Sequence, residues 1–267
     1  MAPLSDWREK VSVRAGWVRA ARAARSVVDL VFPPRCVWCG SEPNGGPDWA
    51  AEGLLCPECA EQLGPKHRNA CRRCGGDVPP ETPHPDRCAW CRNAQLHFDS
   101  VVALGNYHGP LQNVVAAMKA PAGGTLAEAL ARLLFERHEA EFRRLRPDFA
   151  VPVPLYWGCR LGRGVDGAET MARALAGRLR LPMPPRLVVR SRRTEPQKGL
   201  PPRARFRNVR DAFAVRANYH LEDACALVVD DTLTTGATCS EIAWVLKQSG
   251  AAVVHVAVLA RAQGANR

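Results

Sequence analysis

Four pairs of cysteines with the spacing Cys-x-x-Cys lie between residues 36 and 91. Cysteines at this spacing can turn both sulfurs toward one metal ion, and two such pairs supply the four thiolate ligands of a tetrahedral zinc site. The sequence therefore predicts two structural zinc ions. Their predicted ligands are Cys36, Cys39, Cys56, Cys59, Cys71, Cys74, Cys88 and Cys91.

The spacing alone leaves two ways of pairing these cysteines. Gaps of 16, 11 and 13 residues separate successive pairs. They favour sequential pairing, in which the first two pairs share one ion and the last two share the other. A cross-braced arrangement, first pair with third and second with fourth, has the same ligand count and stays open. A thioredoxin-like redox role for Cys36-Val-Trp-Cys39 is disfavoured, because prolines rather than a strand precede it.

Two further cysteines and three histidines are expected in the core or at the surface and not as metal ligands. Cys225 begins an apolar stretch and Cys239 lies within a predicted helix, so both are expected in the core. His67, His84 and His97 are expected at the surface, since eight thiols already satisfy two zinc sites.

A second stretch whose residues could bind a ligand is Leu227-Val-Val-Asp-Asp-Thr-Leu-Thr-Thr-Gly-Ala-Thr238. An apolar strand here delivers two adjacent carboxylates, and a short Thr/Gly loop then opens a helix. The N-terminus of a helix presents unpaired N–H groups and positive dipole, and glycine lets the backbone approach an anion closely. The pattern predicts a phosphate site with carboxylates beside it, which suits a phosphorylated sugar. The predicted ligand-binding residues are Asp230, Asp231, Thr232, Thr234, Thr235, Gly236, Ala237 and Thr238.

The elements that must position this stretch alternate between strand and helix from residue 99 onward. Strands are predicted over 101–104, 149–151, 187–189, 224–229 and 252–259, and helices over 110–119, 125–142, 167–180 and 237–249. Thr125 and Glu128 are read as a capping box that starts the second helix. This alternation predicts an α/β fold with a mostly parallel sheet flanked by helices.

An additional helix is predicted over residues 7–31, with one narrow apolar stripe among arginines. Packing on the protein itself is favoured for it, and an anionic membrane surface is the alternative. Residues 36–91 are rich in Gly, Pro and Cys, so that only a metal framework could order them. The expected organisation is an N-terminal helix over 1–35, a zinc module over 36–95 and an α/β domain over 96–267.

The charge of the chain points to an anionic partner. Residues 1–98 hold 13 Lys and Arg against 11 Asp and Glu, a formal +2, and residues 99–267 hold 24 against 15, a formal +9; together these make the net charge of +11. A substrate or nucleic acid of negative charge would be drawn to the C-terminal part. No stretch approaches 18 uninterrupted apolar residues, which excludes a membrane-spanning helix and leads us to expect a cytosolic protein.

Basic residues concentrate between Arg186 and Arg216. Because Pro and Gly interrupt this segment, we expect a mobile loop that closes over the substrate, with arginines facing a departing pyrophosphate. Contact with single-stranded DNA is the second interpretation, although only Phe206 and Phe213 would supply base stacking. A simply solvated loop is the third.

The stretch at 227–238 resembles the phosphoribosyl-pyrophosphate (PRPP) signature of type I phosphoribosyltransferases. The resemblance implies that Asp230 and Asp231 bind the ribose 2- and 3-hydroxyls and that Thr234 to Thr238 hold the 5-phosphate. The acceptor of the phosphoribosyl group is not apparent from the sequence.

Four further motifs make nearly the whole chain similar to the ComF family, which is linked to competence and DNA uptake. They are the Cys-x-x-Cys head, Tyr107-x-Gly-Pro-Leu111 with Lys119, Val151-Pro-Val-Pro-Leu155 followed by Arg163-Gly164, and Thr194-x-Pro-Gln197 leading to Arg205-x-x-Asn208. The resemblance implies a type I phosphoribosyltransferase-like fold. It also implies that Pro154, Leu155, Arg163, Gln197 and Arg205 face the pyrophosphate, and that Arg163 and Lys119 join the two aspartates in catalysis.

One departure from the family pattern concerns the segment after Arg163. Where the family usually shows Arg-Gly-Phe-Asn-Gln-Ala-Glu, this chain reads Arg163-Gly-Val-Asp-Gly-Ala-Glu169. Asp166 would repel pyrophosphate unless magnesium bridges the two.

The resemblance and the charge lead to two functional hypotheses. The first is a magnesium-dependent phosphoribosyltransferase that acts on PRPP and a nitrogen acceptor. The second is a non-catalytic competence module that senses PRPP or binds single-stranded DNA or a partner helicase.

Overall fold

The computed structural model describes residues 35–42, 54–65, 69–79, 88–155, 166–197 and 199–262. The helix predicted over residues 7–31 lies outside this part of the chain. The helices are α4 (Pro57–Leu63), α5 (Gly109–Ala117), α6 (Gly124–Leu145), α8 (Gly167–Leu179), α9 (Pro202–Val209) and α10 (Ala237–Gln248). The strands are β1 (Ser100–Asn106), β2 (Phe149–Pro152), β3 (Val188–Arg190), β4 (Phe213–Val215), β5 (Cys225–Leu233) and β6 (Val253–Arg261).

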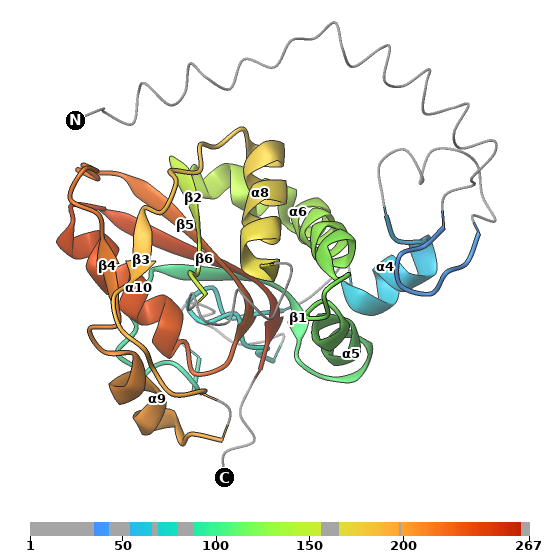
Figure 1. Ribbon diagram of the computed structural model, residues 1–267. Helices are drawn as coiled ribbons and strands as arrows, with labels where there is room; N and C mark the ends of the chain where they lie inside the picture. Colours follow the sequence, from blue (N-terminus) through green and yellow to red (C-terminus); the bar gives the residue numbers. More distant parts are fainter. Residues whose placement is uncertain are drawn as a thin grey trace, which may run out of the picture.

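The central sheet has four strands in the order β1-β6-β5-β2 (Figure 1). All three strand pairs are parallel, and such a sheet needs cover on both faces. The predicted α/β fold with a mostly parallel sheet is therefore confirmed. Because the strands run in the same direction, their carboxyl ends meet at one edge, where ligand sites of such sheets form.

Two separate cores cover the two faces of the sheet, as the alternation of β1 shows. Val101 and Ala103 face the core that contains α10, whereas Val102 and Leu104 face the core that contains α6 and α8. Each core encloses one of the cysteine clusters: that of Cys71, Cys74, Cys88 and Cys91 lies in the α10 core, and Cys36, Cys56 and Cys59 lie in the α6 and α8 core. The two cysteine clusters therefore lie against opposite faces of the sheet.

The segment 186–216 is more ordered than the predicted mobile loop. β3 and β4 form an antiparallel pair, and α9 lies between them in sequence. Proline has no N–H to lose and a helical φ already set at the first helical position, and Pro202 occupies that place in α9. Phe213 is 4% exposed in β4, so its burial holds the segment on the protein and withdraws its ring from base stacking. The prediction of a loop was therefore wrong at β3, α9 and β4, whereas the mostly exposed residues 191–197 form no helix or strand. Closure of this segment over a substrate stays a prediction.

The predicted capping box of α6 was also wrong. The helix begins at Gly124 after Gly123, and no side chain caps it. Thr125 lies inside the first turn, and Glu128 pairs with Arg132 one turn further on at 2.5 Å. Gly123 therefore occupies the N-cap position that the sequence pattern assigned to Thr125.

No helix in the described ranges combines the length and the apolar character that crossing a bilayer requires.

Candidate functional site

The eight paired cysteines form two clusters, each of four sulfurs that lie within 4.8 Å of one another. We call Cys36, Cys39, Cys56 and Cys59 the first cluster, and Cys71, Cys74, Cys88 and Cys91 the second cluster. A Zn–S bond of about 2.3 Å in a tetrahedron places neighbouring sulfurs about 3.8 Å apart. Observed Sγ···Sγ distances are 3.7 Å for Cys39 to Cys56, 3.5 Å for Cys74 to Cys88 and 3.8 Å for Cys88 to Cys91. Both clusters therefore fit zinc, and the sequential pairing is confirmed.

The chemistry of the thiols agrees with this fit. Burial, followed by the neighbouring cysteines, raises the pKa of Cys74 to about 11 and pushes the pKa of Cys59 and Cys91 well above the ordinary value. The pKa of Cys39 is lowered to about 6, mainly by its hydrogen bond with the Ser41 side chain, and hydrogen bonds outweigh burial and lower the pKa of Cys88. Four thiolates at these distances nevertheless repel one another unless a cation lies among them. A divalent metal supplies that charge, and zinc is the usual metal of a four-cysteine site.

The two aspartates of the predicted ligand site lie near the carboxyl end of β5. The strand ends at Leu233, and Gly236 at φ 82° precedes the first turn of α10. This left-handed φ favours glycine. A side chain at position 236 would also lie 3.3 Å from Leu96 and Phe98, so the loop packs closely on the segment that follows the second cluster. We call residues 234–238 the phosphate loop.

The phosphate loop keeps several donors available. No acceptor in the described part of the chain engages the main-chain N–H groups of Gly236, Thr238 and Cys239, and such groups at a helix start bind anions. The buried hydroxyl of Thr232 likewise has no partner there. These groups border a cavity of about 180 Å³ that Asp230 also lines. Several donors without a partner therefore border this cavity, and a phosphate ligand there stays a prediction.

Gln197 reaches this cavity from the other side. Its Nε2 donates a hydrogen bond of 2.7 Å to the Thr238 hydroxyl. Asn208 in α9 exchanges two hydrogen bonds with the backbone of Glu195, at 2.9 and 3.0 Å, and so fixes the segment that carries Gln197. Gln197 therefore lies at the phosphate loop, although it precedes the loop by more than 30 residues in sequence.

The acidic side of the site contains a lysine as well. Lys119, just after α5, places its Nζ 2.9 Å from Oδ2 of Asp231. A second cavity of about 110 Å³ lies here, lined by Lys119, Leu155, Asp166 and both aspartates. Asp166 also caps α8 by accepting a hydrogen bond of 3.2 Å from the N–H of Glu169. Three carboxylates and one ammonium group therefore meet where β5 ends.

The two aspartates differ in environment. Burial, reinforced by the charge of Asp231, raises the pKa of Asp230 to about 8. Burial lowers the pKa of Lys119, but the carboxylate of Asp231 outweighs it and leaves this pKa above the ordinary value. Near neutral pH, Asp230 is therefore largely protonated before a cation or a ligand arrives, whereas Asp231 and Lys119 form an ion pair.

Comparison with known proteins places the chain among relatives. A double zinc ribbon domain matches residues 27–92. Competence protein F of Haemophilus influenzae is 32% identical over 236 residues, which make up 86% of this chain and 98% of that protein. The chain belongs to the ComF family. Among its other members, DNA utilization protein YhgH of Salmonella typhimurium is 30% identical over 236 residues, 87% of this chain and 99% of the relative.

The remaining residues predicted for this ComF-family site differ in where the structure places them. Pro154 and Leu155 follow β2, and Leu155 lines the cavity beside Asp231. Arg205 donates its Nε to the Leu200 carbonyl at 2.9 Å, which braces the turn before α9. Arg163 lies outside the described residues.

Two contacts at the site escaped the sequence reasoning. The thiol of Cys239 lies 3.9 Å from Oδ2 of Asp230, so this buried cysteine packs on the acidic pair as well as within its helix. Arg261 at the end of β6 is 9% exposed and donates to the carbonyls of Leu233 and Thr234. Its signal in the sequence is an arginine that ends a strand whose other residues, apart from His255, are apolar.

Proposed function

We propose that this ComF-family chain binds PRPP with magnesium and transfers the phosphoribosyl group to a nitrogen acceptor with release of pyrophosphate. The observation that carries the proposal is the phosphate loop with unengaged N–H groups, placed next to two adjacent carboxylates at the end of β5. A phosphorylated ribose offers a phosphate for the N–H groups and hydroxyls for the carboxylates.

Binding would divide between the two halves of the site. The N–H groups at the start of α10 would hold the 5-phosphate, aided by the positive end of the helix. Asp230 and Asp231 would accept hydrogen bonds from the ribose hydroxyls. Gln197 already donates to Thr238, and its position beside the loop lets it orient the bound phosphate.

The acidic residues fit magnesium, which prefers oxygen ligands and retains several waters. Asp166, Asp230 and Asp231 line or border the 110 Å³ cavity. Magnesium bound with the substrate would supply positive charge to the pyrophosphate. In this arrangement Asp166, where the chain departs from the family pattern, would help to hold the metal instead of repelling the pyrophosphate.

The transfer itself breaks the bond between C1 of the ribose and a pyrophosphate oxygen, whose electron pair leaves with the pyrophosphate. A nitrogen of the acceptor forms the new bond to C1 and loses its proton to water. Lys119 lies beside Asp231 and would exchange this partner for the charge that develops on the leaving group. We expect Arg163 to assist in the same role.

Calorimetric titration with PRPP and magnesium, followed by a pyrophosphate-release assay with a panel of nucleobases, tests this function. We expect one PRPP per chain and release of pyrophosphate with at least one acceptor. Binding without turnover for every acceptor would instead favour a PRPP sensor, and no heat of binding would contradict both.

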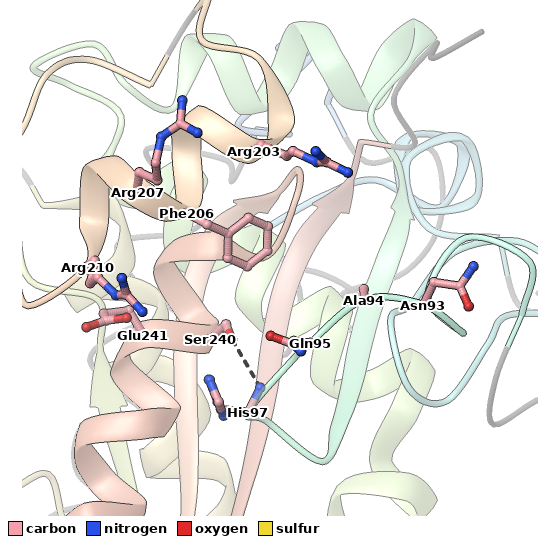
Figure 2. A pocket seen from close by; sticks show the side chains of 10 residues that line it. All are labelled: Asn93, Ala94, Gln95, His97, Arg203, Phe206, Arg207, Arg210, Ser240 and Glu241. Carbon is pink, nitrogen blue, oxygen red and sulfur yellow. Dashed lines mark hydrogen bonds between the residues drawn. The ribbon is translucent and has the colours of Figure 1, made fainter.

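A second candidate function, binding of single-stranded DNA, rests on a groove of about 630 Å³ (Figure 2). We call it the arginine groove. Arg203, Phe206, Arg207 and Arg210 line it at helical spacing from α9, opposite residues 93–97. In Figure 2, Phe206 projects into the space between α10 and that segment. Arginines beside an aromatic ring suit a strand with phosphates and exposed bases.

Neighbouring aromatic residues strengthen this candidate. Trp244 is 43% exposed and stacks at a tilt on His97, with ring centroids 4.8 Å apart. Trp90 is 52% exposed and lies three residues before Asn93 of the groove. Relatives named for competence and DNA utilization agree with a DNA partner. A competence helicase that delivers the strand is the alternative partner.

Binding of an oligothymidine at several salt concentrations tests the groove. Arg203→Ala and Arg207→Ala each remove one phosphate contact, so we expect weaker binding and a salt slope lower by about 0.7 for each. Arg178→Ala, in α8, is the matched control. Unchanged slopes in both groove variants would exclude the arginine groove as the contact.

A cytosolic location and the division of the chain into a zinc module over 36–95 and an α/β domain over 96–267 remain proposals. Four-thiolate zinc sites persist in a reducing compartment, which supports the first.

A further inference from the structure

We propose that Arg261 joins the second cluster to the phosphate loop, so that metal in this cluster holds the loop in its binding shape. The first cluster, with the same ligands, has no such role. The inference concerns the shape of the loop, and its consequence for affinity rests on the proposed function, PRPP binding.

Arg261 contacts both partners with one guanidinium group. Its Nε donates to the Cys74 carbonyl at 2.8 Å. Its Nη1 donates to the Leu233 carbonyl at 2.9 Å and also to the carbonyl of Thr234, the first residue of the phosphate loop. Arg261 is 9% exposed, and its loss would remove the donor to the carbonyl of the buried residue Cys74, which is costly. The Leu233 carbonyl would keep the hydrogen bond from the N–H of Ala262.

A zinc ligand carries one end of this bridge. Cys74 supplies a sulfur to the second cluster and its own carbonyl to Arg261. The surrounding turn is closed by hydrogen bonds from Cys71 N to the Gly76 carbonyl and from Gly75 N to the Cys71 carbonyl, at 2.7 and 2.8 Å. Release of the metal frees the sulfur that anchors Cys74, and its carbonyl then loses its fixed position.

A parallel set of contacts leads from the same cluster to the loop. Arg73 donates to the Leu96 carbonyl at 2.5 Å and lies over the Phe98 ring, 5.8 Å from its centroid. Leu96 and Phe98 in turn lie 3.3 Å from the position a Cβ of Gly236 would occupy. Phe98 is fully buried, so it cannot move without disturbing the loop.

The first cluster is connected elsewhere. Within the described residues, hydrogen bonds of 35–42 and 54–65 stay among themselves or reach α6 through the pair of Arg137 and Glu61. Its neighbour Gly64 packs on Leu104 and Leu133, in the core on the opposite face of the sheet from α10. This cluster therefore provides a control of identical chemistry.

Hydrogen exchange of the amides in residues 234–238 is the experiment, performed on the full chain with measured zinc content. Cys88→Ser and Cys56→Ser each leave one intact cluster. We expect about tenfold faster exchange of the loop in Cys88→Ser and no change in Cys56→Ser. In the Cys56→Ser protein, chelation of the remaining zinc should then produce the same acceleration.

Arg261 is tested as a positioning residue by Arg261→Gln and Arg261→Lys. We expect faster loop exchange in Arg261→Gln with two zinc ions retained, and partial rescue in Arg261→Lys, whose ammonium still reaches the Leu233 carbonyl. Leu175→Ala, in the α8 core, controls for general destabilisation and should leave the loop unchanged. PRPP affinity, measured in parallel, should fall about tenfold in Cys88→Ser and Arg261→Gln.

Equal loop exchange in the two cysteine variants would overturn the inference. Should Cys88→Ser not fold, chelation of the second cluster in Cys56→Ser decides alone, and unchanged exchange there contradicts the coupling. If the wild type binds no PRPP, the proposed function fails, while the exchange rates still report whether the second cluster holds the loop.

Discussion

The two cysteine clusters have the same ligands but occupy different places in the molecule. The second cluster lies in the core of the phosphate loop, on the α10 face of the sheet, and the first lies in the core of α6 and α8. Alternate residues of β1 separate them, because Val101 faces one and Leu104 faces the other. Whether a metal centre affects a ligand site thus depends on which face of the sheet the metal centre packs against. Two metal centres with the same four ligands can differ in this respect.

Removal of both metals is expected to have the largest effect on the chain. Structural zinc contributes folding free energy outright, so chelation should lower the free energy of unfolding by several kcal/mol, measured by denaturant titration at known zinc content. Cys56→Ser and Cys74→Ser should each destabilise the chain and leave one ion bound. A metal content below about 1.5 ions per wild-type chain would contradict the assignment of eight ligands.

Loss of the partly buried carboxylate of Asp231 is expected to rank next. Asp231→Ala removes a predicted hydroxyl contact and the partner of Lys119, so PRPP affinity should fall at least about tenfold, or about 1.4 kcal/mol. The side chain of Asp231 is 24% exposed, and unfolding should change little. Calorimetry measures the first effect and thermal melting the second, with Glu139→Ala on α6 as control. An unchanged dissociation constant would remove the proposed role of Asp231.

The pH dependence sharpens the difference between the two aspartates. Since the folded-state pKa of Asp230 is about 8, against 3.8 ordinarily, the folded chain retains a proton that the unfolded chain releases. The contribution of this group to stability therefore falls as pH rises from about 4 to about 8.

Binding should show the opposite trend. Magnesium and ribose hydroxyls need the carboxylate, so PRPP affinity should rise with pH up to about 8, with proton release at pH 7. Calorimetry in buffers of different ionisation enthalpy detects the released proton. Asp230→Asn should abolish the release; release that persists in this variant would assign it to another group.

The smallest expected effect concerns Gln197. Gln197→Ala removes one hydrogen bond to Thr238, worth about 1 kcal/mol, so PRPP affinity should fall about fivefold. Gln62→Ala, in the first-cluster helix α4, serves as a matched control on the opposite face. Equal affinities in the two variants would show that Gln197 braces the empty loop only.

The sequence alone was sufficient to predict those parts of the candidate site whose signals lie close together in the chain. The run from Asp230 to Thr238 combines a strand end, a glycine turn and a helix start, and each is a local signal. The Cys-x-x-Cys spacing likewise predicted two metal sites, but it could not decide their pairing, which depends on how the chain folds over β1. Proline and glycine predicted a loop throughout 186–216, but β3, α9 and β4 form within it, and burial of Phe213 in β4 depends on contacts that the local sequence does not show.

The contacts that no local signal could predict join distant parts of the chain. Arg261 and Cys74 are 187 residues apart in sequence, and only the parallel pairing of β1 with β6 brings them together. The arginine groove similarly combines α9, α10 and the segment after Cys91. Charge composition indicated an anionic partner but could not locate the surface that meets it.

The central claim is that the phosphate loop and its neighbouring carboxylates form the PRPP site. Hydrogen exchange of the full zinc-loaded chain, with and without PRPP and magnesium, tests it most directly, because the N–H groups of Gly236, Thr238 and Cys239 are the proposed phosphate donors. We predict slower exchange of these N–H groups on addition of PRPP. Unchanged exchange there, or protection confined to the arginine groove, would contradict the account.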